Sequence, residues 1–299
     1  MKKFLKKVTF FLVIPVIGCH IIALVVYLAG LPGVENEIGH IARSTPVLIV
    51  GDSQMQKYSP EFFGPNARNI ASVGEHYFFT HLKLRRLFNV PDSKIKCVVI
   101  GVSVHNFSPM FQNYISPRAP EGKANMKRYL YFINIFNNDF VGIEKYILSK
   151  EFFQGVIQGP DWGGLVNSFD QSPPIPLIEK RLADTFQRAL ADDVKDFKGQ
   201  ELYLKKIVEL CKAKGVHLVM VSSPVHEYFK AHVDKPYFDA LAEATQNYDD
   251  VLYLNFLKDN VPSTYMNDPN HMNKTGADIY SKKINAEIAR LEFTSDSGK

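Results

Sequence analysis

Short apolar runs alternate with amphipathic stretches along most of the chain, and this alternation predicts the elements of a folded domain. Runs rich in β-branched residues predict strands at residues 47–50, 66–72, 95–102, 216–222 and 251–256. Amphipathic stretches predict helices at residues 77–88, 200–214, 236–247 and 274–291. The alternation favours a parallel sheet covered by helices, so the predicted fold class is α/β with about five strands.

The alternation breaks over residues 107–198, where no clear buried strand occurs. A Gly-Pro-Asp-Trp-Gly-Gly turn spans residues 159–164, and Pro173, Pro174 and Pro176 cluster after it. We predict a mostly helical insertion after the third strand, forming a lid over the ligand-binding edge of the sheet. Ordinary core packing explains most of its aromatic residues. They are Tyr129, Tyr131, Phe132, Phe136, Phe140, Tyr146, Phe152, Phe153 and Trp162.

The N-terminus reads as a membrane anchor. Residues 1–7 are basic, and the apolar residues that follow, to Leu31, are numerous enough to cross a bilayer. The lysines are expected to stay in the cytoplasm, which places the rest of the chain outside it. A cleaved signal peptide, or cleavage and lipidation at Cys19, is the alternative. An uncleaved anchor is favoured because residues 21–31 continue apolar after that cysteine.

The anchor sets the predicted domain organisation. Residues 1–31 form the basic segment and the transmembrane helix, and residues 32–46 form a polar juxtamembrane connector. The folded domain occupies residues 47–293, and residues 294–299 form a frayed tail.

Composition excludes several classes of function. The 299 residues are 46% hydrophobic, which is ample for a large core. The formal net charge of +4 equals the contribution of the four lysines in residues 1–7, so residues 8–299 are balanced and lack the basic field that nucleic acids attract. The cysteines Cys19, Cys97 and Cys211 form no Cys-x-x-Cys pair, so no zinc or redox framework is predicted. We expect neither a metal nor a cofactor. Cys97 and Cys211 lie among apolar residues and are expected to be buried thiols.

The first candidate for chemistry is Gly51-Asp52-Ser53, directly after the first predicted strand. Ligands bind at the carboxyl ends of strands in open α/β sheets, so Ser53 is expected in a crevice there. Backbone N–H groups of the same turn could stabilise an oxyanion. An ordinary Asp-Ser turn is the alternative.

The second candidate is the loop before the last predicted helix, which contains Asp268 and His271. On a tight loop this spacing lets the carboxylate reach Nδ1 of the imidazole and leaves Nε2 free to take a serine proton. Because the sheet is parallel, this loop and Ser53 are expected at the same edge. The alternative is that Asp268 caps a turn and His271 is an ordinary surface histidine.

Together these residues resemble the SGNH (GDSL-type) hydrolase superfamily, in its membrane-anchored envelope branch. The matching motifs are Gly51-Asp52-Ser53, the Gly74 that ends Asn69-Ile70-Ala71-Ser72-Val73-Gly74, Asn106, and Asp268-Pro269-Asn270-His271. The resemblance covers residues 47–106 and 200–291 and implies a three-layer, flavodoxin-like fold. It implies Ser53, His271 and Asp268 as catalytic residues, with Ser53, Gly74 and Asn106 forming the oxyanion hole.

The third motif departs from the family pattern. The family usually has Gly-x-Asn-Asp, whereas this chain has Gly101-Val102-Ser103-Val104-His105-Asn106-Phe107. Ser103 and His105 are therefore alternatives to Asn106 for the oxyanion role.

The resemblance implies acyl transfer outside the cytoplasm, with Ser53 attacking an ester. The analogy with anchored relatives suggests O-acyl transfer to, or removal from, a cell-envelope glycan, with a multi-pass membrane acyltransferase as a possible partner. A lipid or small-ester esterase and a non-catalytic module that binds a glycan or a partner are the alternatives. No nucleic-acid partner is predicted.

Overall fold

The fold is α/β, as predicted. The computed structural model describes residues 2–133, 149–167, 174–196, 198–246, 248 and 250–296. Four residues singled out in the insertion lie outside these ranges, and they are Phe136, Phe140, Tyr146 and Pro173.

One five-stranded parallel sheet organises the chain, in the order β2-β1-β3-β4-β5. The strands are β1 (Val47–Val50), β2 (Arg68–Asn69), β3 (Cys97–Gly101), β4 (His217–Ser222) and β5 (Val251–Asn255). Every residue of β1 and β3 is buried, because both strands are covered on both faces. The order reverses beside β1, so the carboxyl end of β1 lies where open α/β sheets leave a crevice.

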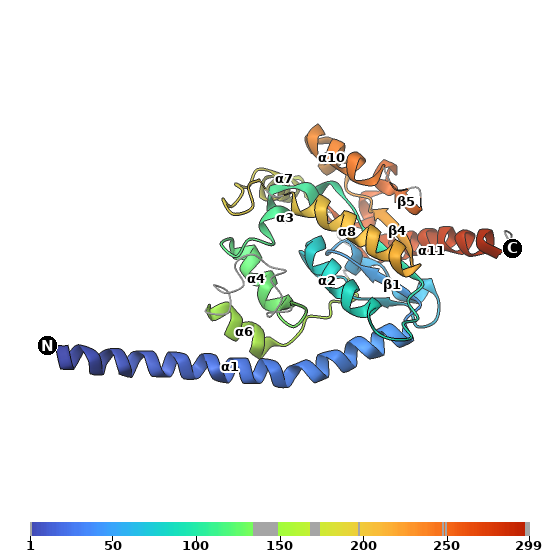
Figure 1. The fold of residues 1–299 in the computed structure, drawn as a ribbon. Coiled ribbons are helices and arrows are strands. Elements are labelled where there is room, and N and C mark those ends of the chain that lie inside the picture. Colours follow the sequence, from blue (N-terminus) through green and yellow to red (C-terminus); the bar gives the residue numbers. More distant parts are fainter. Residues whose placement is uncertain are drawn as a thin grey trace.

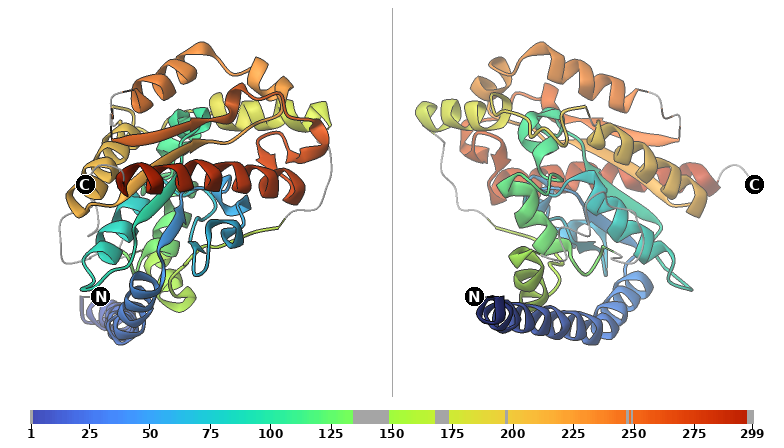
Figure 2. Two further views of the ribbon diagram at one scale, coloured as in Figure 1. Left: turned by 90° about the vertical axis from the view of Figure 1, so that its right-hand side faces the viewer. Right: turned by 60° about the vertical axis from the view of Figure 1, so that its left-hand side comes forward.

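Helices cover both faces of the sheet. Side chains alternate along β1, so that Leu48 and Val50 enter one apolar cluster while Val47 and Ile49 enter another. The first cluster includes residues of α2 (Tyr77–Phe88), α8 (Gly199–Lys214) and α10 (Lys235–Thr245). The second includes residues of α11 (Lys274–Asp296), which runs along the other face of the sheet (Figure 2).

The second strand is shorter than predicted. Residues 66–72 were expected to form it, but only Arg68–Asn69 has strand geometry. The Asn69 side chain accepts a hydrogen bond from the Ala71 N–H, which turns the backbone out of the regular ladder. Pairing with the first strand nevertheless continues, because the N–H of Ser72 donates to the Gly51 carbonyl at 2.9 Å.

The insertion is mostly helical where it is described. It contains α3 (Pro109–Asn113), α4 (Pro120–Tyr129), α6 (Lys150–Gln158) and α7 (Ile175–Phe186). The turn at residues 159–164 packs on the edge of the sheet, where the Gly164 N–H donates to the Ala71 carbonyl at 2.9 Å. Close packing requires glycine at Gly163, since a Cβ there would lie 2.2 Å from the Ala71 carbonyl oxygen.

Most of the predicted lid aromatics belong to the core instead of the ligand edge. Tyr129, Tyr131, Phe132 and Phe152 are buried in the cluster that contains α2. Trp162 packs edge-on against Phe132, with ring centroids 5.1 Å apart. Core packing was the alternative explanation of these residues, and it holds for the ones described.

The N-terminal segment is one helix, α1 (Lys2–Ser44), whose first half extends beyond the domain (Figure 1). Residues 17–44 of α1 include a stretch long and apolar enough to cross a membrane. The segment predicted as a polar connector is helical and packs on the domain, with Val34, Ile38 and Ile41 at most 4% exposed. Tyr27 also stacks on Tyr131 of the insertion, with ring centroids 5.2 Å apart. The Tyr27 hydroxyl donates a hydrogen bond to the Ile133 carbonyl at 3.3 Å.

The loop predicted before the last helix, which contains Asp268 and His271, has more structure than expected. It contains a two-stranded antiparallel hairpin, β6 (Met266–Asp268) and β7 (His271–Met272). Short helices flank the loops at this edge: 3-10 turns at Met55–Lys57, Pro60–Phe63, Val104–Phe107, Phe256–Lys258 and Ser263–Tyr265, and α9 (Glu227–Ala231). The closing helix α11 continues to Asp296, past its predicted end at residue 291 and into the predicted tail.

Candidate active site

Ser53 follows β1 through a turn that requires glycine. Gly51 has φ of 118°, a region that residues with a Cβ rarely adopt. A Cβ there would also lie 3.3 Å from the Gly101 backbone nitrogen of the neighbouring strand. The turn therefore presents Ser53 at the carboxyl end of the sheet, as the sequence predicted.

Asp268 and His271 oppose each other on the β6–β7 hairpin. Ser53 Oγ lies 2.7 Å from His271 Nε2, and both carboxylate oxygens of Asp268 lie 2.8 Å from His271 Nδ1. Asp268 Oδ1 also accepts the backbone N–H groups of Asn270 and His271, at 3.1 and 3.0 Å. The carboxylate therefore closes the turn and orients the imidazole at once, so the two roles weighed for it coexist.

Side chains other than Ser53, His271 and Asp268 also hold the two loops in place. Gln54 Nε2 donates to the Asn270 carbonyl at 2.8 Å, which ties the Ser53 loop to the hairpin. Asn69 Nδ2 donates to the carbonyls of Met55 and Tyr58, at 2.8 and 2.9 Å. These bonds hold Ser53 and His271 in register although the residues are 218 positions apart.

The charge of Asp268 suits the orientation of an imidazole. Burial raises the pKa of its carboxyl. The opposing effects are larger and bring the pKa down to about 2: they come from the hydrogen bond and charge of His271, the Asn270 N–H and the charge of Arg181. Asp268 is thus a carboxylate at neutral pH. Burial lowers the pKa of the neighbouring Lys57, and the charge of Asp268 opposes that shift.

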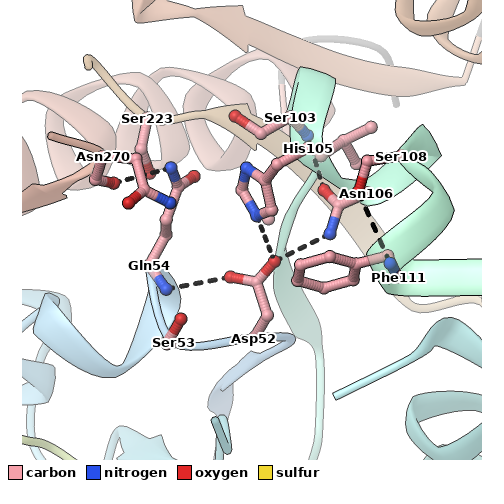
Figure 3. Close-up of polar contacts among 12 residues, drawn as sticks. Asp52, Ser53, Gln54, Ser103, His105, Asn106, Ser108, Phe111, Ser223 and Asn270 are labelled. Carbon is pink, nitrogen blue, oxygen red and sulfur yellow. Dashed lines mark hydrogen bonds and ion pairs between the residues drawn. The ribbon is translucent and has the colours of Figure 1, made fainter. Parts of the chain in front are cut away.

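Asp52 has a buried network of its own. Its Oδ2 lies 2.7 Å from His105 Nε2 and accepts a hydrogen bond from Asn106 Nδ2 at 2.7 Å, while Oδ1 accepts the Gln54 N–H at 2.9 Å (Figure 3). Burial raises the pKa of the Asp52 carboxyl, but His105 and the other two donors hold it below its usual value. The network anchors the residue that directly precedes Ser53.

A cavity of about 250 Å³ opens beside the serine. Its lining combines both candidate loops with the insertion, which contributes Met110, Phe111, Tyr114, Val166 and Arg181. The other lining residues are Ser53, Gln56, Lys57, Val73, Gly74, His105, Asp268, Asn270 and His271. The predicted placement of insertion residues at the ligand edge therefore holds for these positions.

The three candidate oxyanion donors are placed differently. Ser53 and Gly74 line the cavity, and Gly74 has φ of 63° beneath the Tyr114 ring. Asn106 is buried and does not line the cavity, since its amide serves Asp52, the Ser103 N–H at 2.7 Å and the Tyr77 hydroxyl at 3.2 Å. Of the alternatives weighed for it, His105 lines the cavity, whereas Ser103 is buried elsewhere.

Comparison with known proteins adds little. No protein-family model matches the chain, and no curated protein matches it. A solved structure described as a "putative platelet activating factor from Streptococcus pneumonia" is 10% identical, covers 87% of this chain and 93% of its own, and has a TM-score of 0.41. A likeness this distant supports no conclusion about fold or function.

Sequence reasoning missed a buried ion pair behind the Gly74 loop. Lys83 Nζ lies 2.6 Å from Glu75 Oε2, with side chains 1% and 0% exposed. Glu75 also accepts hydrogen bonds from Tyr129 and Thr80, at 2.8 and 2.7 Å. The sequence pattern did not indicate this ion pair, because a lysine in a helix normally lies at an exposed position. Helix α2 is instead buried on most sides.

The sequence also gave no reason to select the two cations of the cavity, Lys57 and Arg181. Within the described ranges, no three histidine, cysteine, aspartate or glutamate side chains gather as metal ligands would.

Proposed function

We propose that this chain is a serine acyl-transfer enzyme of the SGNH (GDSL) type. The observation that carries the proposal is the continuous contact from Ser53 Oγ through His271 to Asp268, with both junctions at 2.7–2.8 Å. A serine, an imidazole and a carboxylate in this order form the arrangement that activates a hydroxyl for attack on an ester. The strand order, with Ser53 after β1 at the point where the order reverses, supports a three-layer, flavodoxin-like member of that superfamily.

The proposed reaction has two halves. Ser53 Oγ attacks the ester carbonyl while His271 Nε2 takes its proton, and the ester C–O bond breaks as His271 returns that proton to the departing alcohol. A second hydroxyl, from water or an acceptor, then attacks the acyl-serine as His271 takes its proton, and the acyl–Oγ bond breaks as His271 returns that proton to Ser53 Oγ. The backbone N–H groups of Ser53 and Gly74 are the proposed oxyanion donors.

The N-terminal helix supports a proposal for where in the cell this reaction takes place. Because lysines precede the apolar stretch, we propose that the domain lies outside the cytoplasm on a single-pass anchor. There it would move O-acyl groups to or from an envelope glycan, with the acyl group supplied by a multi-pass membrane acyltransferase. Protease added outside spheroplasts should digest the domain, and protection of the domain would reverse the topology.

A fluorophosphonate probe tests the chemistry directly, since it reacts with activated serines. The purified chain should be labelled, and Ser53→Ala and His271→Ala should abolish labelling. A matched control is Ser223→Ala, which changes a buried serine hydroxyl that contacts Tyr58 at 2.8 Å but does not line the cavity. Absence of labelling in the folded wild-type chain would favour a non-catalytic binding module.

A further inference from the structure

The cavity beside Ser53 carries two cationic side chains from distant parts of the chain. Lys57 follows Ser53 in the first loop, and Arg181 comes from α7 of the insertion. Both are partly buried, so their charges act in surroundings less polar than bulk water.

The carboxylates nearest to Ser53 are already engaged with other groups. Asp268, which also lines the cavity, accepts hydrogen bonds from His271 and from two backbone N–H groups. Asp52 is buried against His105 and Asn106. In the described part of the chain, no carboxylate forms an ion pair with Arg181, whereas two other arginines of the insertion, Arg128 and Arg188, pair with Asp161 and Glu121. The remaining one, Arg118, is exposed and does not line the cavity.

An arginine held in a cavity without an ion-pair partner suits an anionic ligand, because its planar donors match carboxylate and phosphate oxygens. On the basis of the proposed function, we infer that the cavity takes an acceptor saccharide bearing a carboxylate or phosphate, which Arg181 binds with Lys57 close by. The α7 backbone is held on the core through Ile178 and Thr185, so Arg181 is presented by a fixed element. The anion would fix which hydroxyl of the sugar lies next to His271.

The test separates binding from chemistry. In Ser53→Ala, which cannot form an acyl-enzyme, calorimetry should measure binding of the full chain in nanodiscs to three oligosaccharides: oligogalacturonate, neutral oligogalactan and a glycerol-phosphate oligomer. We expect at least one anionic oligomer to bind about tenfold or more tightly than the neutral one, since one charge-assisted hydrogen bond is sufficient for such a difference. The two anionic arms distinguish a carboxylate from a phosphate.

Variants on α7 supply the controls. Arg181→Gln should remove the preference for the anionic oligomer, and Arg181→Lys should keep part of it. Lys180→Gln makes the same change of charge at the adjacent exposed residue, outside the cavity, and should keep the preference. Equal binding of all three oligomers, or an unchanged preference in Arg181→Gln, would overturn the inference.

Kinetics and labelling keep this inference separate from the proposed function. In active enzyme with an aryl acetate donor, Arg181→Gln should raise KM for the anionic acceptor far more than KM for a neutral acceptor, whereas Lys180→Gln should leave both unchanged. A fall in kcat with every substrate would instead make Arg181 part of the acyl-transfer machinery. If Ser53 fails to react with fluorophosphonate while Arg181-dependent anion binding persists, the enzyme proposal fails and the anion site stands.

Discussion

Asp52 and His105 form a second carboxylate–imidazole pair at this edge of the sheet, with Oδ2 and Nε2 2.7 Å apart and both side chains 2% exposed. Asp52 directly precedes Ser53 in sequence, and neither member of the pair contacts the Ser53–His271 hydrogen bond, although His105 also lines the cavity. The hydrogen bond between Asp52 and His105 therefore helps to fix the turn that carries Ser53.

We therefore expect the two side chains to be energetically coupled. Asp52→Asn should lower the free energy of unfolding by about 1.5–3 kcal/mol, because a buried hydrogen bond to a charged group is lost. Urea titration of Asp52→Asn, His105→Gln and the double variant measures the coupling. Strictly additive losses would show that the contact contributes nothing.

Ser53 and His271 should behave as one unit in activity. Alanine at either position should remove nearly all esterase activity, and the double variant should be no worse, because either loss alone disables the proton transfer. Hydrolysis of an aryl acetate measures this. If His271→Ala keeps more than about a tenth of the activity, the imidazole is not the base, since its loss normally costs orders of magnitude.

The depressed pKa of Asp268 predicts how stability depends on pH. Its carboxyl titrates near 3.9 in an unfolded chain and at about 2 in the fold, so its stabilising contribution is complete above about pH 5 and is lost as pH falls towards 2. The difference in unfolding free energy between wild type and Asp268→Asn should therefore shrink as pH falls from about 5 to about 2. A difference that stays constant over this range would contradict the assignment.

Two ion pairs of equal length differ in their burial. Lys83–Glu75 and Lys235–Asp239 both have N···O distances of 2.6 Å, but the first pair is buried while the second is 82% and 60% exposed. Lys83→Met should cost about 3–5 kcal/mol, because it leaves a buried carboxylate unpaired. Lys235→Met should cost less than about 1 kcal/mol. Lys83→Met/Glu75→Gln should recover part of the first loss, as thermal unfolding would show.

The buried face of α1 predicts how far the N-terminus can be shortened. A chain beginning at Gly33 keeps Val34, Ile38 and Ile41 and should be soluble and folded. A chain beginning at Val47 loses these three buried side chains, each contributing about 1.5–3 kcal/mol, which approaches the whole stability of a domain. Circular dichroism and proteolysis compare the two, and equal stability would contradict packing of α1 on the core.

Regular hydrophobic periodicity made the strands of the sheet predictable, whereas contacts that form only through long-range packing could not be predicted. The apolar runs that became β1, β3, β4 and β5 lie within a residue or so of prediction at most ends. Strands β1, β3 and nearly all of β4 are buried, and strands covered on both faces have unbroken apolar sequences. The spacing of Asp268 and His271 similarly specifies a local hydrogen bond. Partners such as Arg181 and Lys57 meet only through the tertiary fold, so nothing local in the sequence marks them.

The packing of α1 also determines how the domain would move relative to a bilayer if it is anchored as proposed. The helix runs without interruption from its apolar first half to the residues that pack on α2 and α6, and it ends three residues before β1. A helix fixed in this way transmits the tilt of its membrane segment to the sheet, whereas a flexible linker would let the domain rotate freely. With the proposed anchor, the fold therefore sets the height and orientation of the Ser53 cavity above the membrane, and the proposed glycan would have to come to that level to reach it.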